Sequence, residues 1–149
     1  MGILIIKGSE GMHMKKYDIE DLYWEDWDEL VKNQMEIDNI FAYIKDFDSR
    51  NDKELGQILQ LYSNPSGSFT NEFASIVAEI YKYDRIKFIK ALRFVKDETS
   101  NIVYVLRNLK VFENEDHELS SILESGELDE EEIEVAKDLF QMYKKVCVS

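Results

Sequence analysis

Apolar residues recur at intervals of three and four along most of the chain, which is the spacing of one face of an α-helix. The spacing is clearest over residues 70–83 and 84–96, and again over residues 133–146. Proline occurs once, and the six glycines lie mainly near the predicted helix ends and breaks. Because residues that interrupt helices are scarce, the pattern predicts helices joined by short turns.

Several predicted helices begin at residues whose side chains can accept hydrogen bonds from free backbone N–H groups. Asp52 and Asp84 each precede an apolar-periodic segment, so both are predicted N-caps. Asp129 stands three residues before Glu132, which is the spacing of a capping box. This pair predicts the start of the last helix, whose first turn also carries a run of glutamates suited to the positive end of the helix dipole.

The remaining boundaries are less sharply marked. Residues 17–47 follow helical spacing with a shift of phase near Asn33 and Gln34, so two helices or one kinked helix are expected there. The segment SNPSGS (63–68) is typical of a turn between helices. A helix from Asp97 or Thr99 is expected to end near residue 109. A short helix at about 119–123 follows the polar segment ENEDHE and ends before ESGE (124–127).

These elements predict an all-α fold, either a compact helical bundle or a short α–α superhelix, with six to eight helices. Residues 17–149 are assigned to a single helical domain, because this length is that of one ordinary domain. Residues 1–16 are assigned to an N-terminal arm that is flexible or vector-derived. No strand is expected after residue 17, because no hairpin turn flanks the β-branched runs.

The segment NEFASIVAEIYKYDRIKFIKALRF (71–94) carries a resemblance to a known group of proteins. Its helix–Asp–helix plan resembles the helical hairpins of uncharacterised bacterial proteins with a short, HEAT-like α-superhelical body. The resemblance covers about residues 70–110 and implies a bacterial protein with stacked helical hairpins. It implies no activity, and no functional residue is carried over from it.

Charge is distributed unevenly along this acidic chain, whose formal net charge is -13. Residues 82–110 contain eight basic and three acidic residues, whereas residues 113–138 contain twelve acidic residues and one lysine. On a helix spanning 84–96, Arg85, Arg93 and Lys96 form a basic stripe. Either the acidic C-terminal segment folds back beside this stripe, which we favour, or the two regions bind different partners. Surface pairs of this kind contribute only about 0–1 kcal/mol each.

The segment DIEDLYWEDWDE (18–29) concentrates carboxylates around two tryptophans. On one continuous helix Glu25, Asp28 and Glu29 would share a face and could hold Mg²⁺ or Mn²⁺ through oxygen ligands. A docking surface for a basic partner and a solvated acidic face are the alternatives, and the solvated face is favoured. The segment DFDSRNDKELGQ (46–57) begins like a calcium loop, but Arg50 occupies a ligand position, which argues against calcium binding.

Motifs for other chemistry are missing from the sequence. His13 and His117 are its two histidines, and neither has the spacing of a zinc motif. No nucleophile elbow and no glycine-rich phosphate loop occurs. We therefore expect no catalytic residue, no metal site and no cofactor. Cys147 is the single cysteine, which favours a cytoplasmic protein; export with a removed leader is the alternative.

The function expected from these observations is binding to another protein, without enzymatic activity. The partner is expected to be basic rather than a nucleic acid or a membrane, because the chain is strongly acidic. An immunity protein or inhibitor would fit, since charge steers such proteins onto basic targets. The alternative is a carboxylate-dependent, metal-assisted hydrolase that uses residues 18–29. The oligomeric state is left open. The candidate partner-binding residues are Trp24, Trp27, Asp28, Tyr81, Arg85 and Arg93.

Overall fold

The computed structural model describes residues 17–63 and 69–148, and within these residues all regular structure is helical. The predicted arm at residues 1–16 and nearly all of the predicted turn at 63–68 lie outside the described residues. Seven described helices have eight residues or more, which agrees with the predicted all-α fold: α4 (Gln34–Lys45), α5 (Asp52–Gln60), α6 (Thr70–Tyr83), α7 (Arg85–Leu92), α8 (Thr99–Asn108), α9 (Glu115–Glu124) and α10 (Glu130–Val148).

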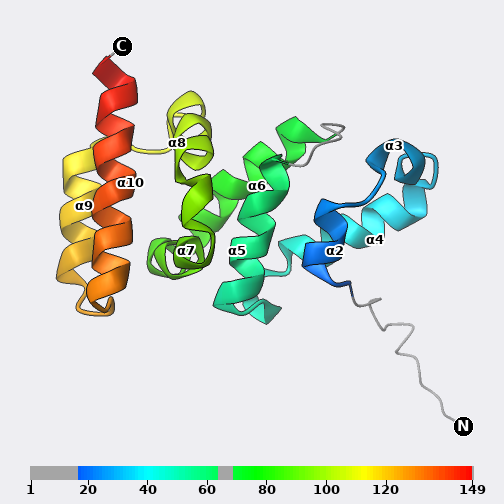
Figure 1. The fold of residues 1–149 in the computed structure, drawn as a ribbon, viewed down its shortest axis with the longest axis horizontal. Helices are drawn as coiled ribbons and strands as arrows, with labels where there is room; N and C mark the ends of the chain where they lie inside the picture. The colour runs from blue at the N-terminus through cyan, green and yellow to red at the C-terminus, as the bar shows by residue number, and fades with distance from the viewer. Residues whose placement is uncertain (1–16, 64–68, 149) are drawn as a thin grey trace, which may run out of the picture.

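Shorter elements join these helices. Two short α-helices, α2 (Ile19–Tyr23) and α3 (Trp27–Leu30), precede α4. Three 3₁₀ segments lie between longer helices: η1 (Phe47–Ser49), η2 (Leu61–Ser63) and η3 (Arg93–Glu98). The helices follow one another in a row, with α2–α4 at one end and α9 and α10 at the other (Figure 1). Within the row α5 packs against α7 and η3, and α8 packs against α10.

One hydrophobic core runs through the whole row of helices. At the N-terminal end its centre is Trp27, whose ring makes edge-to-face contacts with Phe69 and Phe73. At the C-terminal end Phe112 stacks on Phe140 of α10, with ring centroids 4.9 Å apart. Aromatic pairs of this kind add about 0.5–1.5 kcal/mol each beyond the area they bury. Most of the aromatic residues therefore stabilise the fold rather than forming its surface.

The predicted caps at Asp84 and Asp129 are confirmed. The Asp84 carboxylate accepts a hydrogen bond from the backbone N–H of Lys87 at 3.0 Å, and the same residue closes α6. Asp129 and Glu132 form both hydrogen bonds of the predicted capping box. Asn33, at the predicted shift of phase, caps α4 through the N–H of Glu36. The helix starts at Asp84 and Asp129, which side-chain caps determine, were thus predictable from the sequence.

The expected helix over residues 17–33 is wrong, because the chain turns between Tyr23 and Trp27. Trp24 ends α2, and the Asp26 carboxylate begins α3 by accepting the N–H groups of Asp28 and Glu29. Aspartate competes for backbone N–H groups in this way, and so favours a new start over a continuous helix. Glu25 therefore does not share a helical face with Asp28 and Glu29.

The expected helix over residues 84–96 is also shorter in the structure. The α-helix ends at Leu92, and Val95 within η3 has non-helical torsions (φ -137°, ψ 49°). The turn brings η3 against α5 at Gly56. A Cβ atom on Gly56 would stand 2.6 Å from the carbonyl oxygen of Ala91, so only glycine allows this approach without a shift of the backbone.

Two further boundaries differ from prediction by a few residues, and a third agrees with one of two predicted starts. Asn51, not Asp52, caps α5, and it forms a full capping box with Glu54. The short helix predicted at 119–123 begins earlier, at Glu115, because the Asn114 side chain accepts the N–H of His117. Of the two starts offered for the helix near residue 100, Thr99 is the one that the structure uses.

Candidate functional site

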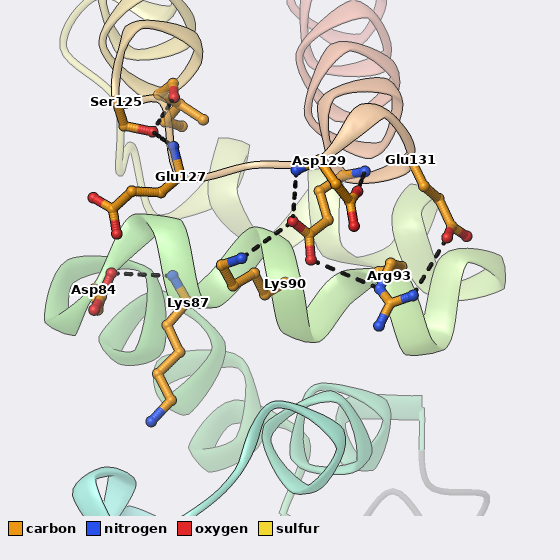
Figure 2. Close-up of polar contacts among 10 residues, drawn as sticks. Asp84, Lys87, Lys90, Arg93, Ser125, Glu127, Asp129 and Glu131 are labelled. Carbon is orange, nitrogen blue, oxygen red and sulfur yellow. Dashed lines mark hydrogen bonds and ion pairs between the residues drawn. The ribbon is translucent and has the colours of Figure 1, made fainter.

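Three basic residues of α7 and η3, namely Lys90, Arg93 and Lys96, face the start of α10. Figure 2 shows Lys90 and Arg93 pointing towards the segment that carries Asp129 and Glu131. Arg93 Nη1 lies 3.3 Å from Glu131 Oε1, and Lys96 Nζ lies 2.7 Å from Glu131 Oε2. These hydrogen bonds hold the pKa of the Glu131 carboxyl below its usual value. The favoured explanation of the charge asymmetry, internal pairing, is therefore confirmed for this part of the stripe.

Glu132 is the most enclosed member of this ion-pair network. Its side chain is 8% exposed, and its Oε1 atom accepts hydrogen bonds from the backbone N–H of Asp129 at 3.0 Å and from Lys90 Nζ at 3.1 Å. Arg93 Nε lies 3.8 Å from its second oxygen. One carboxylate thus closes the capping box of α10 and joins that helix to α7 and η3.

Arg85 and Tyr81 contact another acidic residue, Glu118 on α9. Arg85 Nη1 lies 3.4 Å from Glu118 Oε1, and Nη2 donates to Ser121 Oγ at 2.7 Å. The Tyr81 hydroxyl donates to Glu118 Oε1 at 2.6 Å, and burial, followed by this hydrogen bond, raises the pKa of Tyr81. In the first turn of α9, Asp116 pairs with Lys144 and raises the pKa of that lysine.

Four of the predicted partner-binding residues therefore make contacts within the fold, and Arg85 does so through Glu118 and Ser121. Tyr81 is only 5% exposed, so its assignment to a binding surface is wrong. Trp27 is wrong for the same reason: it is 0% exposed, and its indole N–H donates to the carbonyl of Leu22 at 3.0 Å. The turn at 24–26 leaves Trp27 at the start of α3, where its side chain packs in the core. Arg93 is partly exposed but is held in the ion pairs with α10.

The acidic segment at 18–29 contains the starts of two separate helices, α2 and α3. The carboxylates of Asp18 and Asp26 accept backbone N–H groups at the starts of α2 and α3, and Glu29 pairs with Lys32 at 2.9 Å. Asp28 is exposed on α3. Within the described residues no group of three or more acidic, histidine or cysteine side chains is placed to hold a metal ion.

In the segment that begins like a calcium loop (46–57), Arg50 makes contacts within the fold. The Arg50 guanidinium stacks over the Tyr43 ring, 3.9 Å from the ring centroid, and lies 3.6 Å from Glu54. Its side chain is 10% exposed. The arginine expected to oppose calcium therefore packs inward and joins α4 to α5. The segment itself forms η1 and the first part of α5.

A groove of about 500 Å³ opens between α2 and η3, with α5 as its floor. Trp24 and Tyr23 line it from α2, and Phe94 lines it from η3. Trp24 is 70% exposed and Phe94 is 46% exposed, so two large aromatic side chains stand in solvent at one cavity. We call this cavity the α2–η3 groove. Its volume lies within the range of cavities that hold ligands in proteins.

The aromatic walls of the α2–η3 groove have a defined geometry. The rings of Tyr23 and Trp24 lie edge to face, with centroids 4.8 Å apart and planes at 81°. The Tyr23 hydroxyl donates to the carbonyl of Ser63 at 3.4 Å, which ties α2 to η2. On the opposite wall the Arg93 guanidinium lies 4.6 Å from the centroid of the Phe94 ring.

Two of the candidate partner-binding residues, Trp24 and Arg93, line this groove, whereas Phe94 and Tyr23 were not among the candidates. Phe94 lies outside the apolar stripe of residues 86, 89, 92 and 95, and that position was the signal for its exposure. Tyr23 follows the helical spacing of the apolar residues in this part of the sequence, and that spacing predicts a buried position. The groove itself depends on the turn after Tyr23 and on the 3₁₀ turn at Val95, and neither turn carries a glycine or a proline.

No protein-family model, no curated protein and no solved structure matches this chain. Among the helices that the structure describes, none combines the length and the apolar character needed to cross a membrane.

Proposed function

We propose that this protein acts by binding another protein, without enzymatic activity, and that the α2–η3 groove is the contact surface. The observation that carries the proposal is the pair of exposed aromatic side chains, Trp24 and Phe94, at the rim of one cavity. Burying large aromatic side chains supplies much of the energy of protein interfaces. Exposed apolar side chains that gather at one cavity are typical of protein interaction sites.

The charge beside the groove supports a basic partner. Residues 17–31 contain seven acidic side chains and neither lysine nor arginine. The C-terminal acidic segment, in contrast, is paired with the basic residues of α7 and η3. An acidic surface next to aromatic anchors accelerates association with a basic protein and selects against acidic ones.

An inhibitor or immunity-type protein of a bacterial cytoplasm fits this description best. Such a protein covers the basic surface of an enzyme that acts on an anionic substrate, and steering by opposite charge matters for its speed. The competing proposal, a metal-assisted hydrolase at residues 18–29, has less support. The carboxylates of Asp18 and Asp26 are used as helix caps, and Glu25 is separated from Asp28 by the turn.

Affinity capture from the source organism tests the proposal. The wild type, Trp24→Ala and the matched control Tyr104→Ala serve as baits; Tyr104 is 56% exposed on α8, away from the groove lining. A basic protein retained by the wild type and by Tyr104→Ala, but lost with Trp24→Ala, is the expected result. Equal retention by all three baits would overturn the assignment of the groove, and retention of no protein would count against binding altogether.

A further inference from the structure

We infer that the α2–η3 groove receives a cationic side chain, lysine or arginine, of the partner protein. The inference deepens the proposed function and rests on it. The cation would sit against the corner formed by Tyr23 and Trp24, with the carboxylates of Glu20 and Asp97 on the two sides of the groove. The occupant is thus defined by its chemistry: an alkyl chain that ends in a positive charge.

The aromatic corner is the first part of the argument. Two rings at 81°, with centroids 4.8 Å apart, form two perpendicular walls. A cation in such a corner can lie over the face of one ring, where the negative electrostatic potential of the π system attracts it. Tryptophan is the most favourable of the aromatic residues in this role. Phe94 on η3 adds an apolar surface for the alkyl part of the side chain.

The charges of the groove are the second part of the argument. Three basic residues line it, but two of them, Arg93 and Lys96, are paired with Glu131 on α10. Glu98 accepts hydrogen bonds from Ser63 and Asn101.

The charged lining residues outside these contacts are Glu20, Asp97 and Lys53. The carboxylates stand on opposite walls, one from α2 and one from η3, whereas Lys53 belongs to the α5 floor. The two carboxylates and one ammonium group of these residues carry a net negative charge, which favours a bound cation over an anion. The Lys53 ammonium group would compete with that cation for the carboxylates.

A titration with matched small probes tests this inference directly on the full chain. The probes are Nα-acetyl-lysine methylamide and Nα-acetyl-norleucine methylamide, a neutral analogue that lacks the terminal ammonium group, at constant ionic strength. Tryptophan fluorescence is the readout, because Trp24 is exposed and Trp27 is buried. We expect a saturable change with the lysine probe at a midpoint of about 1 mM, and a midpoint at least about fivefold higher with the norleucine probe.

Substitutions in the walls and in the floor of the groove are expected to change the affinity for the lysine probe in opposite directions. Trp24→Leu removes the indole ring and is expected to lower the affinity for the lysine probe by about 3-fold to 30-fold. Because this variant lacks the exposed fluorescent side chain, its binding is followed by NMR chemical shifts. Glu20→Gln is expected to lower the affinity for the lysine probe by up to about fivefold. Lys53→Gln is expected to raise that affinity by a similar factor. Circular dichroism that matches the wild type checks that each variant folds, and Tyr104→Ala is the control with unchanged binding.

The outcomes separate this inference from the proposed function. Equal binding of both probes would show an apolar pocket and overturn the cation site. No saturable change up to about 100 mM, roughly a hundred times the expected midpoint, would also overturn it. Partner capture that depends on Trp24 would leave the proposed function standing in either case. Conversely, a bound lysine probe without Trp24-dependent capture would contradict the proposed function alone.

Discussion

The Glu132 carboxylate should carry more of the folding stability than any other acidic side chain in the ion-pair network at α10. Its side chain is 8% exposed, whereas Lys90 and Arg93 are 29% and 33% exposed. Breaking a fully buried pair costs about 3–5 kcal/mol; because both cations keep part of their hydration, Glu132→Gln should cost about 1–2 kcal/mol. Glu132→Ala also loses the hydrogen bond from the Asp129 N–H, which adds about 1 kcal/mol.

Urea unfolding at pH 7 measures these changes, and a double-mutant cycle isolates the contact. Glu132→Gln combined with Lys90→Met should show a coupling of about 1 kcal/mol, because the two side chains are 3.1 Å apart. Glu130→Gln is the matched control, since Glu130 is exposed on the same helical turn. A coupling near zero, or an equal loss in the control, would refute the claim that this contact joins α10 to α7.

Three further predictions concern single positions in the same scaffold. Gly56→Ala should destabilise the fold by about 1–3 kcal/mol in urea unfolding despite the better helix propensity of alanine, because the new Cβ meets the Ala91 carbonyl at 2.6 Å; a stabilised variant would show that α5 and α7 are further apart. Lys110→Gly should stabilise by about 0.5–1 kcal/mol in the same assay, because Lys110 has a φ of 52° after α8; a loss of stability would indicate that its side chain matters. Glu131→Gln should be less stable than the wild type at pH 7, and the gap should close as the pH falls below the usual value of 4.5. The folded-state pKa of Glu131 is lowered, so its contribution is present above that value and is lost as the carboxylate is protonated; thermal unfolding between pH 7 and pH 3 that shows a constant gap would contradict this.

The parts of the fold that follow from local rules were predictable. Asp84 and the Asp129–Glu132 pair mark helix starts because their carboxylates can satisfy backbone N–H groups wherever the chain goes next. The pairing of basic and acidic regions was predictable in outline, since α7 and α10 carry opposite charge. Which cation meets which carboxylate was not, because that depends on how the helices are rotated and spaced.

The parts that depend on packing between distant segments were not predictable. The turn between α2 and α3 places Trp27 in the core and leaves Trp24 in solvent, although the two residues are three positions apart. Both tryptophans looked equally suitable for binding in the sequence. The bend at Val95 has no proline or glycine to announce it, and it accompanies the close approach of η3 to Gly56. The α2–η3 groove is the product of these two turns.

Site-specific photo-cross-linking in the source organism tests the central claim most directly. The photoreactive residue p-benzoylphenylalanine replaces Phe94 at the groove or, as the control, Tyr104 on α8, both of which are exposed aromatic positions. The proposed function predicts a discrete adduct with one basic protein from position 94 and not from position 104, and loss of that adduct when Trp24 is also changed to alanine. Equal adducts from both positions, or an adduct at 94 that survives Trp24→Ala, would contradict it.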